Sequence, residues 1–312
     1  MDIIIRALAA VARNGRIALV IGLIAGLSLP NVAQILRPWL PQMIAALLFL
    51  TAFRIGPNAA LGGLADGLST LKVALLYQVV MPLVALAVFW AVGVSATPFA
   101  IAILLMLSAP SVTGSPNLTI LLGHNPEPAF RILIIGTAIL PLTIIPIFWL
   151  SPALGDLSAI LIAAFRLLGA IALSVSAAFL LRKFVAPAIS SAKIEALDGV
   201  MAIALAVIVV GLMAALGPAL KSDPVLVLKW LAVALIANLG LQYIAFTVMR
   251  LRGKHDVAVP FGIVAGNRNF ALFLIALPAA TTEPLLIFLG CYQVPMYLTA
   301  ILMRRVYARH GQ

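Results

Sequence analysis

Hydrophobic residues follow one another along this chain in long continuous runs, without the alternation of a half-buried strand. A membrane-spanning helix needs about 20 apolar residues, and in lipid a run of that length satisfies its backbone groups when it is helical. The ten predicted spans are residues 16–30, 40–56, 70–93, 97–123, 129–151, 157–181, 197–219, 225–249, 256–280 and 284–303. Residues 3–13 predict a short helix that lies on the inner membrane surface.

The composition indicates lipid as the solvent. Hydrophobic residues make up 64% of the chain and charged residues 9%, against about 25% charged residues in a soluble domain. The sequence therefore predicts an all-α integral membrane protein whose partner is the lipid bilayer. The net charge of +11 does not indicate a nucleic-acid partner, because the basic residues lie between the apolar runs. The single cysteine, Cys291, excludes an intrachain disulfide and a multi-cysteine metal cluster.

The basic residues are divided unequally between the two predicted sides of the membrane. Ten spans place both termini on one side, and fifteen of the 20 basic residues fall there, in the termini and the even-numbered loops. The opposite side holds Arg37, Lys221 and Lys229. Because cytoplasmic loops carry the excess of Lys and Arg, we expect a multi-pass protein of the cell inner (plasma) membrane with both termini cytoplasmic. Arg54, near a span end, is expected to anchor the inner interface.

Two of the predicted spans share an interrupted segment. The fourth contains V-T-G-S-P-N at 112–117 and the ninth contains V-A-G-N-R-N at 264–269, a common V-x-G-x-x-N pattern. Each is the fourth span of five, so residues 1–156 and 157–312 are predicted to form two five-helix repeats. The repeats are inverted because five spans reverse the direction of the chain. Paired, Gly- or Pro-interrupted segments in corresponding positions are typical of a transporter's binding site.

These segments resemble the bile acid:sodium symporter family, part of the bile/arsenite/riboflavin transporter superfamily. Gln78–Pro82 resembles the family's Q-x-x-M-P stretch, Pro110–Asn117 its P-G-G-x-x-S-N turn, and Gly266–Asn269 its G-x-Q-N turn. The resemblance implies a panel domain of spans 1, 2, 6 and 7 and a core domain of spans 3–5 and 8–10, in which broken helices 4 and 9 cross. It also implies sodium-coupled, alternating-access transport of organic anions.

The chain departs from this family where sodium would bind. The family's glutamate position is Val264, the glutamine of its ninth-span turn is Arg268, and Pro116 stands where serine is expected. Gln78 is retained from the sodium ligands, and Thr137 is the nearest match to the span-five hydroxyls. All nine acidic residues fall in termini, loops or span ends, whereas hard cations usually bind carboxylate oxygens. We therefore expect neither sodium nor another metal or cofactor as a partner, with a sodium site built from neutral ligands as the alternative.

Arg268 is the sharpest candidate for a functional residue. It lies at a helix break within a predicted span, where a charge costs roughly 2.5–3.5 kcal/mol and marks a functional site. Its guanidinium could pair with a carboxylate through two hydrogen bonds. It could instead act as a tethered cation that takes the place of sodium and satisfies carbonyls of the broken fourth helix. A buried arginine that only braces the break is the structural alternative.

Polar residues accompany both interruptions. They either cap N–H groups where a helix restarts or contact the substrate directly. The predicted substrate-binding or crossover residues are Arg268, Asn117, Asn267, Asn269, Ser115, Thr113 and Gln78.

Other polar and small residues within spans favour structural roles. Asn238 and Gln242 lie one turn apart on the eighth span and predict interhelical hydrogen bonds. Gly22 and Gly26 form a G-x-x-x-G helix-packing face. Arg166, in the middle of the sixth span, is expected to be structural, with its charged end reaching the interface or a cavity.

The function predicted from these features is secondary transport of a small organic anion by alternating access, independent of sodium, with Arg268 in place of the coupling cation. A sodium-coupled organic-anion symporter that uses neutral ligands is one alternative. A membrane enzyme or sensor without transport is another, but no buried carboxylate pair, zinc-ligand spacing or P-loop supports a catalytic site. The chain is therefore not expected to be an enzyme.

Overall fold

The computed structural model describes residues 2–62 and 67–308, and every named regular element within them is a helix. Asp66 and Arg309, which the predicted charge pattern includes, lie outside the described residues. The chain forms two compact units, each drawn from two stretches: unit 1 is residues 1–61 and 169–227, and unit 2 is residues 62–168 and 228–312. Unit 1 contains predicted spans 1, 2 and 7, and unit 2 contains spans 3–5, 9, 10 and most of 8. The sixth span is divided between the units.

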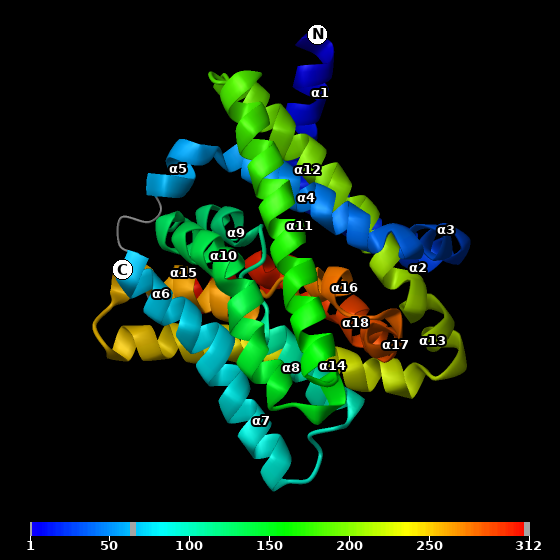
Figure 1. Ribbon diagram of the computed structural model, residues 1–312. Coiled ribbons are helices and arrows are strands. Elements are labelled where there is room, and N and C mark those ends of the chain that lie inside the picture. The colour runs from blue at the N-terminus through cyan, green and yellow to red at the C-terminus, as the bar shows by residue number, and fades with distance from the viewer. Residues whose placement is uncertain (1, 63–66, 309–312) are drawn as a thin grey trace. The chain divides into compact units, whose positions relative to one another are not determined.

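Unit 1 is arranged around one long helix, α12, against which α1, α2, α3 and α4 pack (Figure 1). Its elements are α1 (Asp2–Arg13), α2 (Gly15–Ser28), α3 (Pro30–Leu36), η1 (Arg37–Trp39), α4 (Leu40–Ile55), α5 (Pro57–Gly62), the second half of α11 (Leu157–Phe184), α12 (Ser191–Leu212), η4 (Met213–Ala215) and α13 (Leu216–Ser222).

Glycines let helices of unit 1 approach one another closely. A Cβ atom at Gly22 would lie 2.7 Å from the carbonyl oxygen of Ala206, and one at Gly26 would lie 2.6 Å from the Cβ of Met213. The predicted packing role of the G-x-x-x-G face is confirmed, and its partners are α12 and the η4 turn that follows it. Arg54 on α4 has a partner that the sequence did not reveal: its Nε and Nη2 donate to the two carboxylate oxygens of Asp198 on α12, over 2.6 and 3.1 Å.

The predicted helix at 3–13 is present as α1, and Gly199 on α12 holds it close. A Cβ atom at Gly199 would overlap the backbone of Leu8, lying 2.7 Å from its carbonyl carbon. We expect Gly199→Ala to displace α1 from α12, because backbone cannot move aside as a flexible side chain can, at a cost of about 1–3 kcal/mol. Hydrogen exchange should then accelerate in residues 2–13. Gly169→Ala on α11, where a Cβ atom meets nothing within 4 Å, is the control, and unchanged exchange in Gly199→Ala would contradict the prediction.

Unit 2 consists of long helices interrupted by short ones. Its elements are α6 (Gly67–Leu75), the π-helical turn η2 (Leu76–Val80), α7 (Met81–Ala91), α8 (Pro98–Ser108), α9 (Ser115–Leu121), α10 (Glu127–Trp149), η3 (Pro152–Leu154), the start of α11, most of α14 (Pro224–Leu251), α15 (His255–Gly266), η5 (Phe270–Leu272), α16 (Phe273–Ala276), α17 (Ala279–Thr282), η6 (Glu283–Leu285), α18 (Leu286–Leu302) and α19 (Arg304–Ala308).

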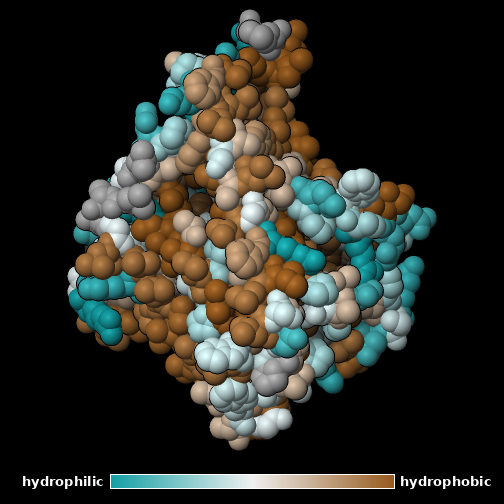
Figure 2. All heavy atoms as spheres, in the orientation of Figure 1, coloured by the Kyte–Doolittle hydropathy of each residue, from teal (hydrophilic) through white to brown (hydrophobic). Residues whose placement is uncertain are grey.

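Seven helical stretches of the described chain are long and apolar enough to cross a membrane, and the bent pair of α1 and α2 could add an eighth. Large apolar side chains on them are exposed, such as Leu173 and Ile236 at 74% each, and brown, hydrophobic residues cover much of the face in Figure 2. Soluble monomers rarely expose apolar patches of this extent. The protein is thus an all-α, multi-pass membrane protein. The count of ten spans and the inverted repeat stay predictions.

The predicted breaks in the fourth and ninth spans are confirmed. Helix α8 ends at Ser108 and α9 begins at Ser115, while α15 ends at Gly266 and η5 begins at Phe270. The first break follows from Pro110: a residue before proline is pushed out of the helical region, and Ala109 has φ −67° and ψ 149°. The second break has no proline, so its conformation depends on the contacts described next.

Candidate functional site

The two broken segments of unit 2 pair with each other. The backbone N–H of Val112 donates to the carbonyl of Asn267 over 2.9 Å, and that of Asn269 donates to the carbonyl of Pro110 over 2.8 Å. These bonds form an antiparallel bridge between Ser111 and Arg268. We call residues 109–114 and 267–269 together the crossover. Each broken segment thus supplies backbone partners that the other lost when its helix ended.

The guanidinium of Arg268 lies at the carbonyl ends of both helices that lead into the crossover. Its Nε donates to the carbonyl of Ala265 over 2.8 Å, and its Nη1 donates to that of Ala109 over 3.1 Å. Ala265 is in the last turn of α15 and Ala109 caps α8. The carbonyl end of a helix carries partial negative charge and has unpaired acceptors, so a fixed cation there satisfies both acceptors and charge.

Arg268 is enclosed by protein, with 2% of its surface exposed. The guanidinium carbon of Arg268 stacks over the ring of Tyr77, on the π-helical turn, 4.9 Å from the ring centroid. The hydroxyl of Tyr292 on α18 accepts a hydrogen bond from the Arg268 backbone N–H over 3.1 Å and donates to the carbonyl of Gly266. Within the described residues, the ion pairs do not include Arg268, and its Nη2 has no acceptor. This geometry fits both the tethered cation and the structural brace, and it leaves one donor nitrogen, Nη2, without an acceptor.

The residues predicted to cap the helix restarts do not do so. The N-cap position of α9 is Gly114 and that of η5 is Asn269, and neither makes a side-chain cap bond. Asn117 is exposed, whereas Thr113 and Asn269 are half-buried. The N-capping interpretation was therefore wrong for these positions; the pairing of the two breaks supplies backbone partners instead.

Ser115 and Asn267 stabilise the breaks in other ways. Ser115 is fully buried and its hydroxyl accepts a hydrogen bond from that of Ser111 over 2.8 Å, across the first break. Asn267 is also fully buried, and its Nδ2 donates to the carbonyl of Ile263 over 2.9 Å. It thus adds a second donor to a carbonyl of α15 that the Asn267 backbone N–H also meets, and it caps no helix start.

Gln78 lies in the same unit but binds a different helix. Its Nε2 donates to the carbonyl of Gly136 over 3.1 Å, and the hydroxyl of Thr143 lies 3.4 Å from its Oε1 and 3.1 Å from the carbonyl of Leu140. The side chain thus joins the π-helical turn to α10, and Thr143 rather than Thr137 is the hydroxyl that it contacts. A Cβ atom at Gly136 would lie 3.7 Å from that of Pro110, so this pair lies beside the first break.

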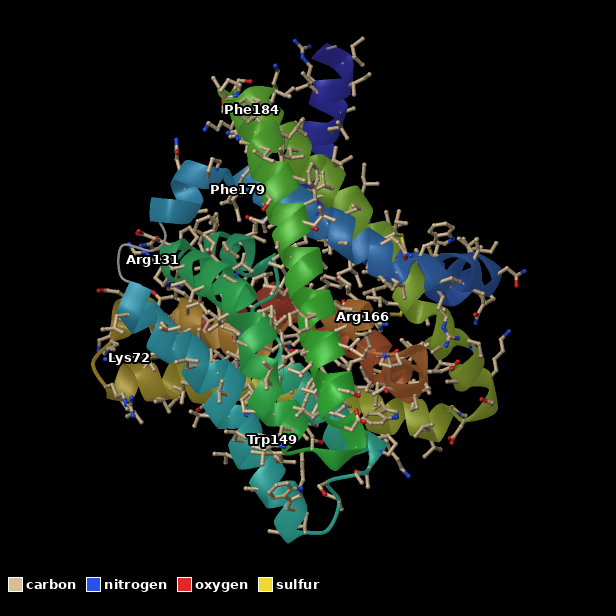
Figure 3. All side chains as sticks on the ribbon, in the orientation of Figure 1. Lys72, Arg131, Trp149, Arg166, Phe179 and Phe184 are labelled. Atoms are coloured by element: carbon tan, nitrogen blue, oxygen red, sulfur yellow. The ribbon has the colours of Figure 1, made fainter. Side chains whose placement is uncertain are left out.

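Asn238 and Gln242 of α14 make interhelical hydrogen bonds, as predicted: Asn238 to the second break and Gln242 to Thr299 of α18. Arg166 is exposed near the middle of α11, where Figure 3 shows its position. It lies apart from the crossover contacts. Sequence reasoning missed Tyr77, Tyr292 and Thr299, because hydroxyl-bearing side chains are common in apolar spans and their direction emerges only when helices pack.

A comparison with protein-family models finds no match to this chain, and a comparison with curated proteins finds no match either.

Proposed function

We propose that this protein is a secondary transporter of a small organic anion that works by alternating access and without sodium. The observation that carries the proposal is the guanidinium of Arg268, buried at the meeting point of two broken helices and bonded to carbonyls from both. Broken helices whose termini face one point near the middle of a membrane protein are the usual setting of substrate and coupling-ion sites. Seven long helices, the bent pair and the two broken spans would complete ten spans.

Arg268 takes the position that a coupling cation would need. The carbonyl of Ala265 has lost its helical partner, because the N–H of Asn269 donates to Pro110 instead. In a sodium-coupled protein such freed carbonyls are ligands for the ion. Here the guanidinium donates to them, and it stays protonated throughout the transport cycle. A cation that is part of the chain cannot dissociate, so the site needs no ion to bind before it changes conformation.

The charge of Arg268 is also the reason for an anionic substrate. A charge at membrane depth costs roughly 2.5–3.5 kcal/mol on the more lenient scale, and no described carboxylate forms an ion pair with it. Within the described residues, the partial negative charges of the helix carbonyl ends surround the guanidinium, but no carboxylate supplies a full countercharge. A substrate carboxylate near the crossover would lower that cost. Nη2 has no acceptor but is buried, so it would meet a carboxylate only after the protein around it rearranges during alternating access.

Uptake into proteoliposomes tests the proposal. A panel of radiolabelled carboxylates (acetate, lactate, succinate and cholate) is offered in sodium buffer and in choline buffer, with protein-free liposomes as the control. We expect at least one anion to enter at the same rate in both buffers, because Arg268 supplies the positive charge in each. A strong requirement for sodium would show that the ion binds neutral ligands and that Arg268 has another role. Protein that transports nothing across a wider panel of anions, cations and sugars would favour an enzyme or a sensor.

A further inference from the structure

A line of buried side-chain hydrogen bonds begins at α19, the last described helix. The hydroxyl of Tyr307 donates to Oε1 of Gln242 over 3.0 Å. Nε2 of Gln242 then donates twice, to Oδ1 of Asn238 over 2.7 Å and to the hydroxyl of Thr299 over 3.1 Å. Three helices, α19, α14 and α18, are joined by these bonds.

The same line ends at the second break of the crossover. Nδ2 of Asn238 donates to the carbonyl of Gly266 over 2.6 Å and to Oδ1 of Asn267 over 3.2 Å. The hydroxyl of Thr299 lies 3.1 Å from that same oxygen and 3.0 Å from the carbonyl of Pro295, so these two acceptors share its single hydrogen. The side chains of α19 and of the break are thus connected through two amides and one hydroxyl, with no gap between them.

Each amide in this line uses all of its hydrogen-bonding groups. Asn238 and Gln242 each donate both amide hydrogens and accept at their oxygen, and both residues are fully buried. A saturated, buried network has one favoured arrangement, and removal of one member leaves the others unsatisfied. A change at the Tyr307 end therefore reaches the amides that hold the break.

The side chain of Tyr307 is tightly packed by its neighbours. Its ring meets that of Phe246 edge to face at 5.1 Å between centroids. A Cβ atom at Gly262 of α15 would lie 2.9 Å from its hydroxyl oxygen, so the hydroxyl reaches Gln242 because position 262 has no side chain. Tyr307 is 1% exposed.

We propose that Tyr307, Gln242, Asn238 and Thr299 form a lock between α19 and the crossover. While α19 holds its place, the lock fixes the backbone of residues 266–267 and with it the position of Arg268. When α19 moves away, Oε1 of Gln242 loses the hydrogen bond that Tyr307 donates to it. The second break then becomes free to change conformation. Tyr307 is then a positioning residue, since it acts on the crossover through Gln242. As a statement about regulation the lock rests on the proposed transport function, whereas its effect on the crossover does not.

Hydrogen exchange measured by mass spectrometry on the protein in lipid nanodiscs tests the lock without any transport assay. Tyr307→Phe keeps the ring and removes the hydroxyl. Exchange should accelerate about tenfold in peptides that cover 263–270 and 303–308, because a buried acceptor is left unpaired. The control is Tyr243→Phe, on the same helix as Gln242 but 55% exposed, which should match the wild type.

A second variant separates the lock from general loss of stability. Thr299→Val removes the hydroxyl from the middle of the line and keeps its volume, so exchange should accelerate in 263–270 while 303–308 stays protected by the intact Tyr307 bond. Unchanged exchange at 263–270 in Tyr307→Phe, or acceleration throughout the chain in Thr299→Val, overturns the lock. Failure to transport any anion in proteoliposomes would instead overturn the proposed function and leave the exchange result standing.

Discussion

Arg268→Gln should lower the free energy of unfolding by about 2–4 kcal/mol. The shorter amide can donate to one of the carbonyls of Ala265 and Ala109 but not to both, and a buried acceptor without a donor costs about 1–3 kcal/mol. The substitution also leaves a void over the ring of Tyr77, which the guanidinium now covers. Relief from burying a charge acts in the opposite direction, but the carbonyl ends of two helices already stabilise that charge. The lost hydrogen bonds and packing should therefore outweigh the relief from burying the charge, and the variant should be less stable than the wild type.

Thermal and denaturant unfolding in detergent measure this effect, with Arg166→Gln as the matched control. Arg166 is an exposed arginine on a spanning helix, so its substitution should change stability by no more than about 0.5 kcal/mol. Arg268→Lys keeps the charge and loses the forked geometry, so it should lie between Arg268→Gln and the wild type. An Arg268→Gln protein as stable as the wild type would show that the crossover does not need the cation.

The same variants separate the two roles of the charge. If Arg268 attracts the substrate, Arg268→Gln should weaken anion binding at least tenfold, as expected from loss of a charge-assisted hydrogen bond of about 1.5–3 kcal/mol, while Arg268→Lys should retain more affinity. Adding Val264→Glu to Arg268→Gln introduces the carboxylate and amide that bile acid:sodium symporters carry in the resembling segment, and sodium should then raise the stability of the double variant. Equal anion affinity in all of these proteins would restrict Arg268 to bracing the break.

The first break was predictable because its cause is local, and the second was predictable only from its shared pattern with the first. Pro110 forces the residue before it out of the helix, and the V-x-G-x-x-N pattern marks the same position in both halves. Arg268 was also predictable, since a charge inside an apolar run needs an explanation. Helix ends were predicted less accurately. The second span was expected from residue 40, but α3 and η1 extend that helical stretch back to Pro30, and proline suits the first turn of a helix.

The partners of these residues were not predictable, because they depend on how distant segments pack. Arg54 and Asp198 are 144 positions apart, and no local pattern relates them. Asn117 and Asn269 hold the same place in the repeated pattern, yet Asn117 is exposed on α9 and Asn269 is half-buried with its N–H bonded to Pro110. Sequence similarity between the two windows therefore predicted the backbone break and not the environment of each side chain.

Gly266→Ala should be among the most damaging single substitutions in unit 2, with a loss of about 3 kcal/mol in the free energy of unfolding. A Cβ atom at this position would overlap the carbonyl oxygen of Asn238 and the Cγ of Gln242. Overpacking of a tight core costs about 1–3 kcal/mol, and the obstacle here includes helix backbone, which gives way least. Moving α15 away from α14 would also break the 2.6 Å bond from Asn238 to the Gly266 carbonyl, so the steric and hydrogen-bond losses act together.

Gly240→Ala is the matched control for this substitution. Gly240 lies on α14, two residues from Asn238, and a Cβ atom there meets nothing within 4 Å. Because alanine is a better helix former than glycine by about 0.5–1 kcal/mol, this variant should be as stable as the wild type or slightly more stable. Thermal unfolding of the two variants side by side in the same detergent compares them directly. If Gly266→Ala unfolds at the same temperature as Gly240→Ala, then α14 and α15 are farther apart than in this structure. That result would also contradict the hydrogen bonds that connect Asn238 to the second break.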